Sequence, residues 1–169
     1  MKTAYSAMKL SLALLVAAAF ARADETERID GTASGTATGV PTADPAVFAT
    51  TIVGTGCVSK LGKATMTASH LIDSNTLAFS SGSVVFAGRK DSIIGTYTGQ
   101  FFLTLRPGIF TFSAPMLITG GTGKFEGCSG SGLITGQVTS NVYPERFTAR
   151  FSARLVTVER ERGAVTWKR

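Results

Sequence analysis

Few side chains in this sequence are suited to acid–base chemistry. His70 is the only histidine, and an imidazole facing an enclosed interior could act as an acid, a base or a ligand anchor. The phenol of Tyr97 could orient an oxygen atom of a ligand, and the carboxylate of Glu126 could act as an acid or base. Each has a structural alternative, namely a hydrogen-bonded histidine at a strand end, a packed tyrosine and a solvated turn carboxylate. These three residues are the candidate catalytic residues, with no reaction assigned to them.

The spacing of the reactive residues argues against several kinds of site. A single histidine cannot build a histidine-rich metal site, and no Gly-x-Ser-x-Gly segment supplies a nucleophile for it. The Gly-Thr-Gly-Lys run ending at Lys124 looks like the end of a phosphate-binding loop, but Ile118 and Phe125 stand where that loop needs glycine and serine or threonine. We therefore predict no metal and no cofactor, and we expect the glycines to supply positive φ angles in a tight strand connection.

Alternation with a period of two residues dominates the chain from Phe48 onward, as in half-buried strands. One face of segment 93–105 carries Ile93, Tyr97, Phe101, Leu103 and Leu105. Segment 146–156 alternates polar residues with Phe147, Ala149, Phe151, Ala153 and Leu155. Segment 109–118 has a row of Phe110, Phe112, Ala114, Met116 and Ile118. A helix would scatter these rows around its circumference, so the three segments are predicted strands.

Weaker strands are expected near 48–58, 61–72, 77–87 and 130–139, separated by turn-forming residues. A strand over 62–72 would place His70 in the same apolar row as Met66, facing the interior. A meander of seven or eight strands with one apolar face must close to bury that face and remove its edges. The predicted fold class is all-β, with a single small antiparallel closed β-barrel of about eight strands and a β-sandwich as the alternative.

The N-terminal segment predicts export. Residues 1–23 have early lysines, an apolar stretch from Leu10 to Phe20 and the Ala21-Arg22-Ala23 pattern of a signal peptidase site, although a buried helix is the alternative. Residues 24–46, rich in Gly, Thr and Ala, are expected to be a flexible leader, part of which could add an edge strand. Residues 47–169 are the predicted barrel domain, in an exported protein that is secreted or periplasmic.

Charge and cysteine content give weaker indications. Three of the 17 basic residues lie in the expected signal peptide, which leaves 14 against 11 acidic residues, a net charge of +3. Binding to nucleic acid needs a clustered basic face, so none is predicted, and no transmembrane segment is expected in the mature chain. Cys57 and Cys128 are the only cysteines, and an oxidising compartment permits a disulfide between them, with two unconnected thiols as the alternative.

One glycine-rich run resembles a known family. The stretch from Ile118 to Gly132, ITGGTGKFEGCSGSG, resembles a turn of bacterial exported proteins with an allene-oxide-cyclase-like barrel, and plant dirigent proteins carry a related turn. The stretch from Gly54 to Lys63 is similar to a segment near the first strands of the bacterial proteins. The resemblance covers about residues 48–158 and implies an eight-stranded barrel whose lumen holds an apolar small molecule. It carries over no catalytic residue, and Cys128 and Lys60 depart from the family pattern.

Three functions follow as hypotheses. The first is binding of a small apolar molecule in the lumen, with Tyr97, Phe101, Phe112 and Met116 as candidate ligand-binding residues. The second is a cofactor-free cyclase or isomerase resembling allene oxide cyclase or dirigent proteins, because a shaped cavity can fold a reactive substrate with few polar groups. The third is a structural or interaction protein of the cell exterior. Neither the ligand nor the oligomeric state is predicted.

Overall fold

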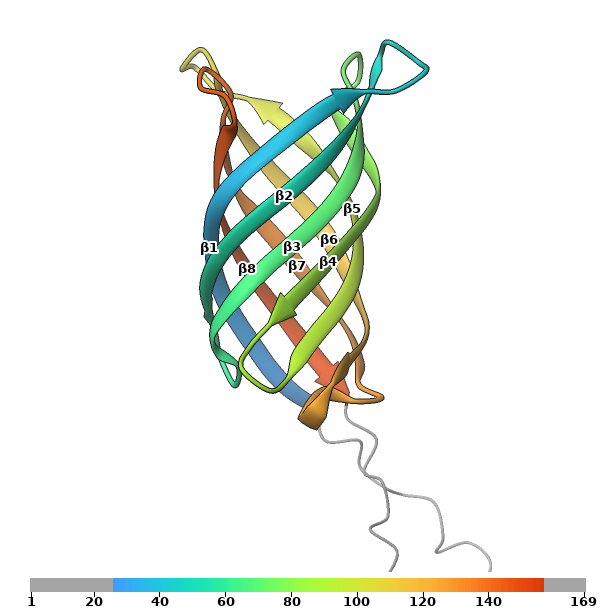
Figure 1. Ribbon diagram of the computed structural model, residues 1–169, viewed down its shortest axis with the longest axis vertical. Coiled ribbons are helices and arrows are strands. Elements are labelled where there is room, and N and C mark those ends of the chain that lie inside the picture. Colours follow the sequence, from blue (N-terminus) through green and yellow to red (C-terminus); the bar gives the residue numbers. More distant parts are fainter. Residues whose placement is uncertain (1–25, 157–169) are drawn as a thin grey trace, which may run out of the picture.

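The structure, a computed structural model, describes residues 26–156. Eight antiparallel strands follow one another in chain order and close into a barrel (Figure 1). The strands are β1 (Thr26–Pro41), β2 (Val47–Val58), β3 (Gly62–Asp73), β4 (Ala78–Ala87), β5 (Ser92–Leu103), β6 (Ile109–Thr122), β7 (Ser129–Thr139) and β8 (Glu145–Val156), with a short 3-10 turn, η1 (Gly123–Phe125), before β7. The predicted closed barrel is confirmed, and the alternative β-sandwich is wrong.

The strand β1 closes the barrel by pairing with β2 along one edge and with β8 along the other. The expectation of a flexible leader over 24–46 is therefore wrong for residues 26–41, which form the longest strand. Its inward row has a large apolar side chain only at Ile29 and continues with Ala33 and Ala37. Small residues suit the narrow interior of an eight-stranded barrel, but they leave little periodic signal in the sequence. The expected signal peptide lies outside the described residues.

The predicted apolar rows of 146–156 and 109–118 face the interior. The row predicted for 93–105 is right at Ile93, Tyr97 and Phe101 but wrong at its end. Leu103 is 75% exposed and Leu105 is fully exposed. The reason is that β5 ends at Leu103, where the chain turns toward β6, so that the alternation no longer sorts side chains to two faces of a sheet.

The two ends of the barrel differ. The end formed by the start of β1, the end of β8, η1 and the β2–β3 and β4–β5 turns is here called the closed end (Figure 1). Phe125 of η1 is 2% exposed there, and above it the rings of Phe86 and Phe151 stack with centroids 4.5 Å apart. This half of the interior is filled with side chains. The opposite end, formed by loops 42–46, 74–77, 104–108 and 140–144, is here called the open end.

The glycine-rich turn covers the closed end. Gly123 has a φ of +63° and Gly127 a φ of +73°, a backbone conformation that other residues rarely adopt, as the sequence predicted for a tight connection. A side chain at Gly123 would also collide with the carboxylate of Asp91 in the β4–β5 turn. The turn therefore folds back tightly enough to insert Phe125 into the core.

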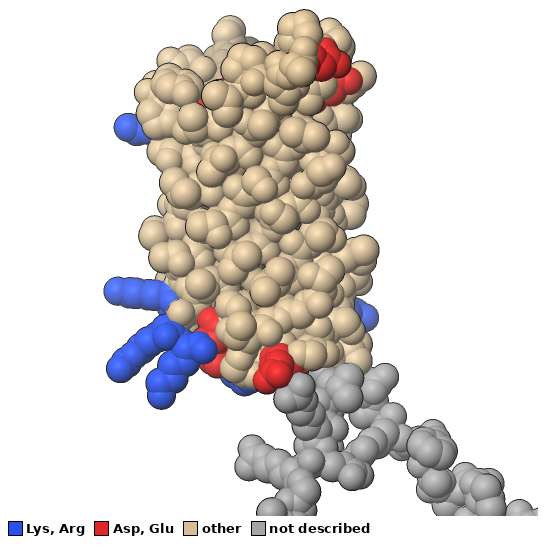
Figure 2. All heavy atoms as spheres, turned by 45° about the vertical axis from the view of Figure 1, so that its right-hand side comes forward, with Lys and Arg blue, Asp and Glu red and all other residues tan. Residues whose placement is uncertain are grey.

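Charged side chains are concentrated near the ends of the barrel. On the face shown in Figure 2, Lys and Arg gather at the closed end, while the wall above them is almost without charge. Within residues 26–156 no helix is long and apolar enough to cross a membrane.

The predicted disulfide between Cys57 and Cys128 is wrong, because both cysteines are free. Cys57 lies on β2 with its side chain exposed, whereas Cys128 follows η1 and is 2% exposed. One thiol therefore faces solvent and the other is packed inside, where burial raises the pKa of the Cys128 thiol.

We expect the two thiols to differ in reactivity. In the folded protein the reagent DTNB should modify Cys57 rapidly, and Cys128 should react only after unfolding in urea, because it is buried and poorly ionised. The variant Cys57→Ser should show no rapid phase. A protein that exposes no thiol in urea without reductant would contradict this assignment, since both cysteines would then be bonded.

Truncating Phe125, which closes one end of the barrel, should lower the stability of the fold. The variant Phe125→Ala is expected to lower the free energy of unfolding by about 3–5 kcal/mol, because it leaves a cavity in the filled half. Phe102, which is 50% exposed on the outer wall, supplies the matched control Phe102→Ala, with an expected loss below about 1 kcal/mol. Urea denaturation measures both values, and equal losses would show that η1 does not seal the core.

Candidate functional site

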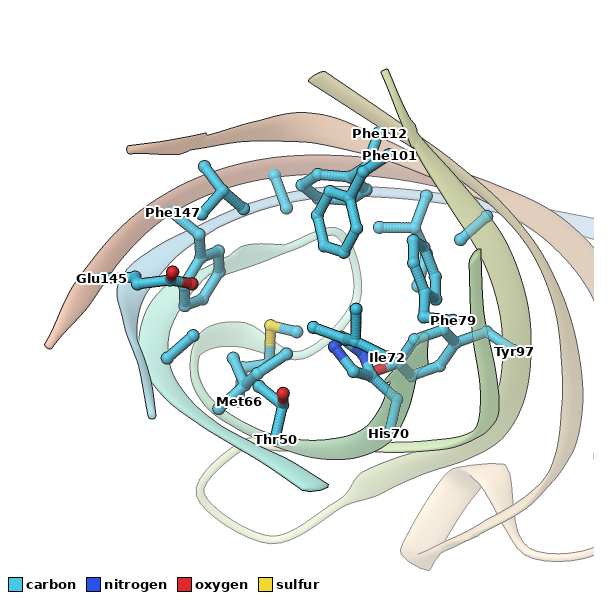
Figure 3. Close-up of a pocket in the computed structure, with 16 residues that line it drawn as sticks. Thr50, Met66, His70, Ile72, Phe79, Tyr97, Phe101, Phe112, Glu145 and Phe147 are labelled. Carbon is cyan, nitrogen blue, oxygen red and sulfur yellow. The ribbon is translucent and has the colours of Figure 1, made fainter. Parts of the chain in front are cut away.

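The upper half of the barrel interior, near the open end, contains a cavity (Figure 3). It has about 50 Å³ of space for the centres of water-sized molecules, whereas one water needs only roughly 10–15 Å³ on this measure. Its lining is mostly apolar and includes five aromatic residues, Phe79, Tyr97, Phe101, Phe112 and Phe147. The barrel interior is therefore filled in the closed half and contains a small cavity in the open half.

The cavity has two unlike walls. On one side, Thr50 of β2 and His70 of β3 are direct partners across the strand pair and both face the interior. On the other side lie the rings of Phe101, Phe112 and Phe147, from β5, β6 and β8 (Figure 3). A molecule in the cavity would thus contact a polar wall and an aromatic wall.

Strand alternation and ring stacking set the position of His70. The regular alternation of β3 places His70 in the same inward row as Met66, and the extra residue of the adjacent bulge lies on β4, where Ser81 has a positive φ. The imidazole then stacks on Phe79 with ring centroids 4.9 Å apart. The backbone of β3 therefore directs the His70 side chain inward, and the Phe79 ring packs against one face of the imidazole.

A hydrogen bond joins His70 to Tyr97. The His70 Nδ1 lies 2.9 Å from the hydroxyl oxygen of Tyr97, while that hydroxyl is 3.5 Å from the carbonyl oxygen of Ser69. If the single hydroxyl proton of Tyr97 is donated to Ser69, then Nδ1–H of His70 donates to Tyr97 and Nε2 faces the cavity as an acceptor. If that proton is donated to Nδ1, the imidazole proton resides on Nε2, which is then a donor.

Two buried polar atoms of the cavity wall have no hydrogen-bond partner within the described part of the chain. They are Oγ1 of Thr50 and Nε2 of His70, on side chains of residues that are 5% and 7% exposed. An unsatisfied buried polar group typically costs about 1–3 kcal/mol. Most such groups in folded proteins find a partner, so this pair calls for an explanation.

Burial keeps the His70 imidazole and the Tyr97 phenol neutral at pH 7. It lowers the pKa of His70 to about 4 and raises the pKa of the Tyr97 phenol, because the low-dielectric interior disfavours both charged forms. Burial also raises the pKa of the Glu145 carboxyl group, which lines the cavity at the start of β8. No lysine or arginine of the described chain lines the cavity.

The structure brings together His70, Tyr97, Phe101 and Phe112, four of the residues singled out by the sequence. It does not bring in the other two. Met116 is 2% exposed in the packed core and does not line this cavity, and Glu126 is exposed beside η1 at the closed end. Glu126 therefore lies at the opposite end of the barrel from the cavity, where it matches the solvated turn carboxylate given as the alternative.

The sequence did not single out four residues as part of a cavity lining, namely Thr50, Phe79, Glu145 and Phe147. The alternation of Thr50 and Ile52 with outward residues of β2 contained a signal for Thr50. Nothing in the sequence marks Glu145, which becomes part of the site only because β8 begins there.

The rim of the open end is uneven. Loops 104–108 and 140–144 lie together, joined by a hydrogen bond from Ser140 N–H to the Gly108 carbonyl. Here and on the adjacent strand end the exposed apolar residues form what we call the apolar lip, made of Phe102, Leu103, Leu105, Val142 and Tyr143. The other two loops meet through the Ser74 N–H and the Ala46 carbonyl, and they carry polar residues.

No group of three or more His, Cys, Asp or Glu side chains within residues 26–156 is arranged to hold a metal ion. Comparisons of the chain with protein-family models, with curated proteins and with solved structures found no match. The geometry of the cavity is therefore the basis for assigning a function.

The buried imidazole should make the protein sensitive to acid. The unfolded chain protonates His70 near pH 6.5 and the folded protein only near pH 4, so its contribution to stability is complete above pH 6.5 and is lost as the pH falls toward 4. Between pH 7 and 4.5 the loss should be about 2 kcal/mol. Urea denaturation of the protein and of His70→Phe at both pH values isolates this loss, and equal changes in the two proteins would contradict a buried neutral imidazole.

Proposed function

We propose that this protein binds a small apolar molecule in the cavity at the open end of the barrel. The observation that carries the proposal is the cavity in the open half of the interior, lined by five aromatic residues and a few convergent polar groups. Sites for small molecules commonly combine an apolar lining with a small number of placed polar groups, and the mouths of β-barrels are a frequent location. Consistent with the predicted signal peptide, we place this activity outside the cytoplasm.

The rim supports the same proposal. The exposed apolar lip borders the mouth, and Leu105 at its tip is fully exposed. An apolar molecule approaching the cavity could contact this surface before entering. Part of its apolar surface would then already be removed from water at the mouth. The filled closed end leaves the mouth as the route of entry.

Catalysis by a cofactor-free cyclase or isomerase, which the resemblance of the glycine-rich turn suggests, has less support. A general base works best with a pKa near the working pH, and burial lowers that of His70 to about 4. The Tyr97 hydroxyl, the other candidate, is hydrogen-bonded to His70 Nδ1. The polar groups of the cavity are therefore better suited to holding a molecule than to moving protons.

A bulky residue at the mouth tests the proposal. Naphthalene, a small neutral probe, should bind saturably in a ¹H–¹⁵N NMR titration and shift the amide signals of cavity residues. The variant Ala37→Phe should weaken binding at least about tenfold, because Ala37 lines the cavity and a ring there would occupy it.

The next residue along β1 supplies the matched control. Thr38 is exposed on the outer wall, so Thr38→Phe adds the same bulk outside the cavity and should leave the affinity unchanged. Absence of saturable binding, or equal weakening by both variants, would refute binding in the lumen.

A further inference from the structure

We infer that the bound molecule is neutral and carries a hydroxyl group that hydrogen-bonds to both Thr50 and His70, and that the site rejects carboxylates. This inference rests on the proposed function, since it names the class of molecule for the same cavity. It is carried by the two unpartnered polar atoms in the cavity wall rather than by the cavity's size.

The two anchoring groups are close together and point the same way. Thr50 and His70 face each other across the β2–β3 ladder, where side chains of partner residues lie on the same face of the sheet. Figure 3 shows the Thr50 side chain and the His70 ring both projecting into the cavity, with the Tyr97 hydroxyl on the far side of the imidazole. One small polar group of a ligand can therefore reach both.

The donors and acceptors select the kind of group. The His70 Nε2 is a donor or an acceptor according to the direction of the hydrogen bond between Nδ1 and Tyr97. The Thr50 hydroxyl can donate or accept, so it adapts to its partner. A ligand hydroxyl can also donate and accept, so it pairs with Nε2 and with Thr50 in either arrangement. A carbonyl oxygen only accepts and an ammonium group only donates, so each of them fits Nε2 in one arrangement alone.

The charge of the wall rejects anions. No cationic side chain of the described residues lines the cavity, and the one ionisable carboxyl group on the lining is that of Glu145. A carboxylate would lose its hydration without gaining a counter-ion, and an ionised Glu145 would repel it. A neutral alcohol meets neither cost.

The opposite wall favours a flat or cyclic apolar body. With the oxygen atom against β2 and β3, the rest of the molecule lies against Phe101, Phe112 and Phe147 (Figure 3). Aromatic rings offer large apolar surfaces of fixed shape. The ligand class is therefore a small cyclic alcohol or phenol.

Three probes with the same ring system test this class at pH 7, namely naphthalene, 2-naphthol and 2-naphthoate. We expect 2-naphthol to bind about tenfold more tightly than naphthalene, because its hydroxyl satisfies two buried groups. We expect 2-naphthoate to bind more weakly than both. Isothermal titration calorimetry or NMR titration measures the three dissociation constants.

Two variants test whether Thr50 and His70 cause the preference for 2-naphthol over naphthalene. In Thr50→Val, which keeps the shape but removes the hydroxyl, the advantage of 2-naphthol over naphthalene should shrink several-fold, and in His70→Phe it should also shrink. The neighbour Thr51, exposed on the outer wall, gives the control Thr51→Val, in which the advantage should persist.

The outcomes separate this inference from the proposed function. If none of the three probes binds, the proposed function fails and the inference fails with it. If naphthalene and 2-naphthol bind equally, or if Thr50→Val and His70→Phe both retain the advantage of 2-naphthol, the oxygen anchor is refuted while lumenal binding stands. If 2-naphthoate binds most tightly, the neutral class is refuted. Because Thr50→Val conserves volume, the test does not depend on the stability of the histidine variant.

Discussion

The interior of an eight-stranded barrel is only just wide enough for side chains, and this protein accommodates large rings by placing them over glycines. Each of four phenylalanines lies where the side chain of an inward-facing glycine on another strand would be. The pairs are Phe151 with Gly31, Phe147 with Gly54, Phe79 with Gly99 and Phe112 with Gly136. Because a methyl group at any of these glycines would overlap the ring, the glycines determine where the rings lie. In the closed half the rings meet and fill the core, whereas in the open half they line the wall and leave a space.

The polar groups of the open half also pack closely in this narrow interior. The alternation of β3 turns His70 inward, and its neighbours are Tyr97, Phe79 and its strand partner Thr50. Burial makes the charged imidazole costly, so the site is polar without being charged. Departures from complete hydrogen bonding in an otherwise consistent fold are concentrated at functional sites. The two unpartnered atoms lie on the wall of the cavity near the open end.

The sequence predicted this fold where large and polar residues alternate, and it failed where they do not. The row from Phe147 to Leu155 was recognisable because arginine, threonine and serine separate its apolar residues, and the same argument turned His70 inward. In β1 the inward positions are mostly alanine and glycine, so a strand could not be told from a flexible segment. Thr50 escaped notice because threonine is typical of an exposed strand face, and its environment depends on a partner strand.

Residues Thr26 and Val156 are paired at the closed end, so the described chain begins and finishes on the side of the barrel away from the cavity (Figure 1). An affinity tag, a sensor surface or a fused carrier joined next to Thr26 or Val156 would therefore sit at the end of the barrel opposite the mouth. Protein immobilised in this way would present its cavity to the solution, which makes surface-based screening of small molecules practical without redesigning the chain.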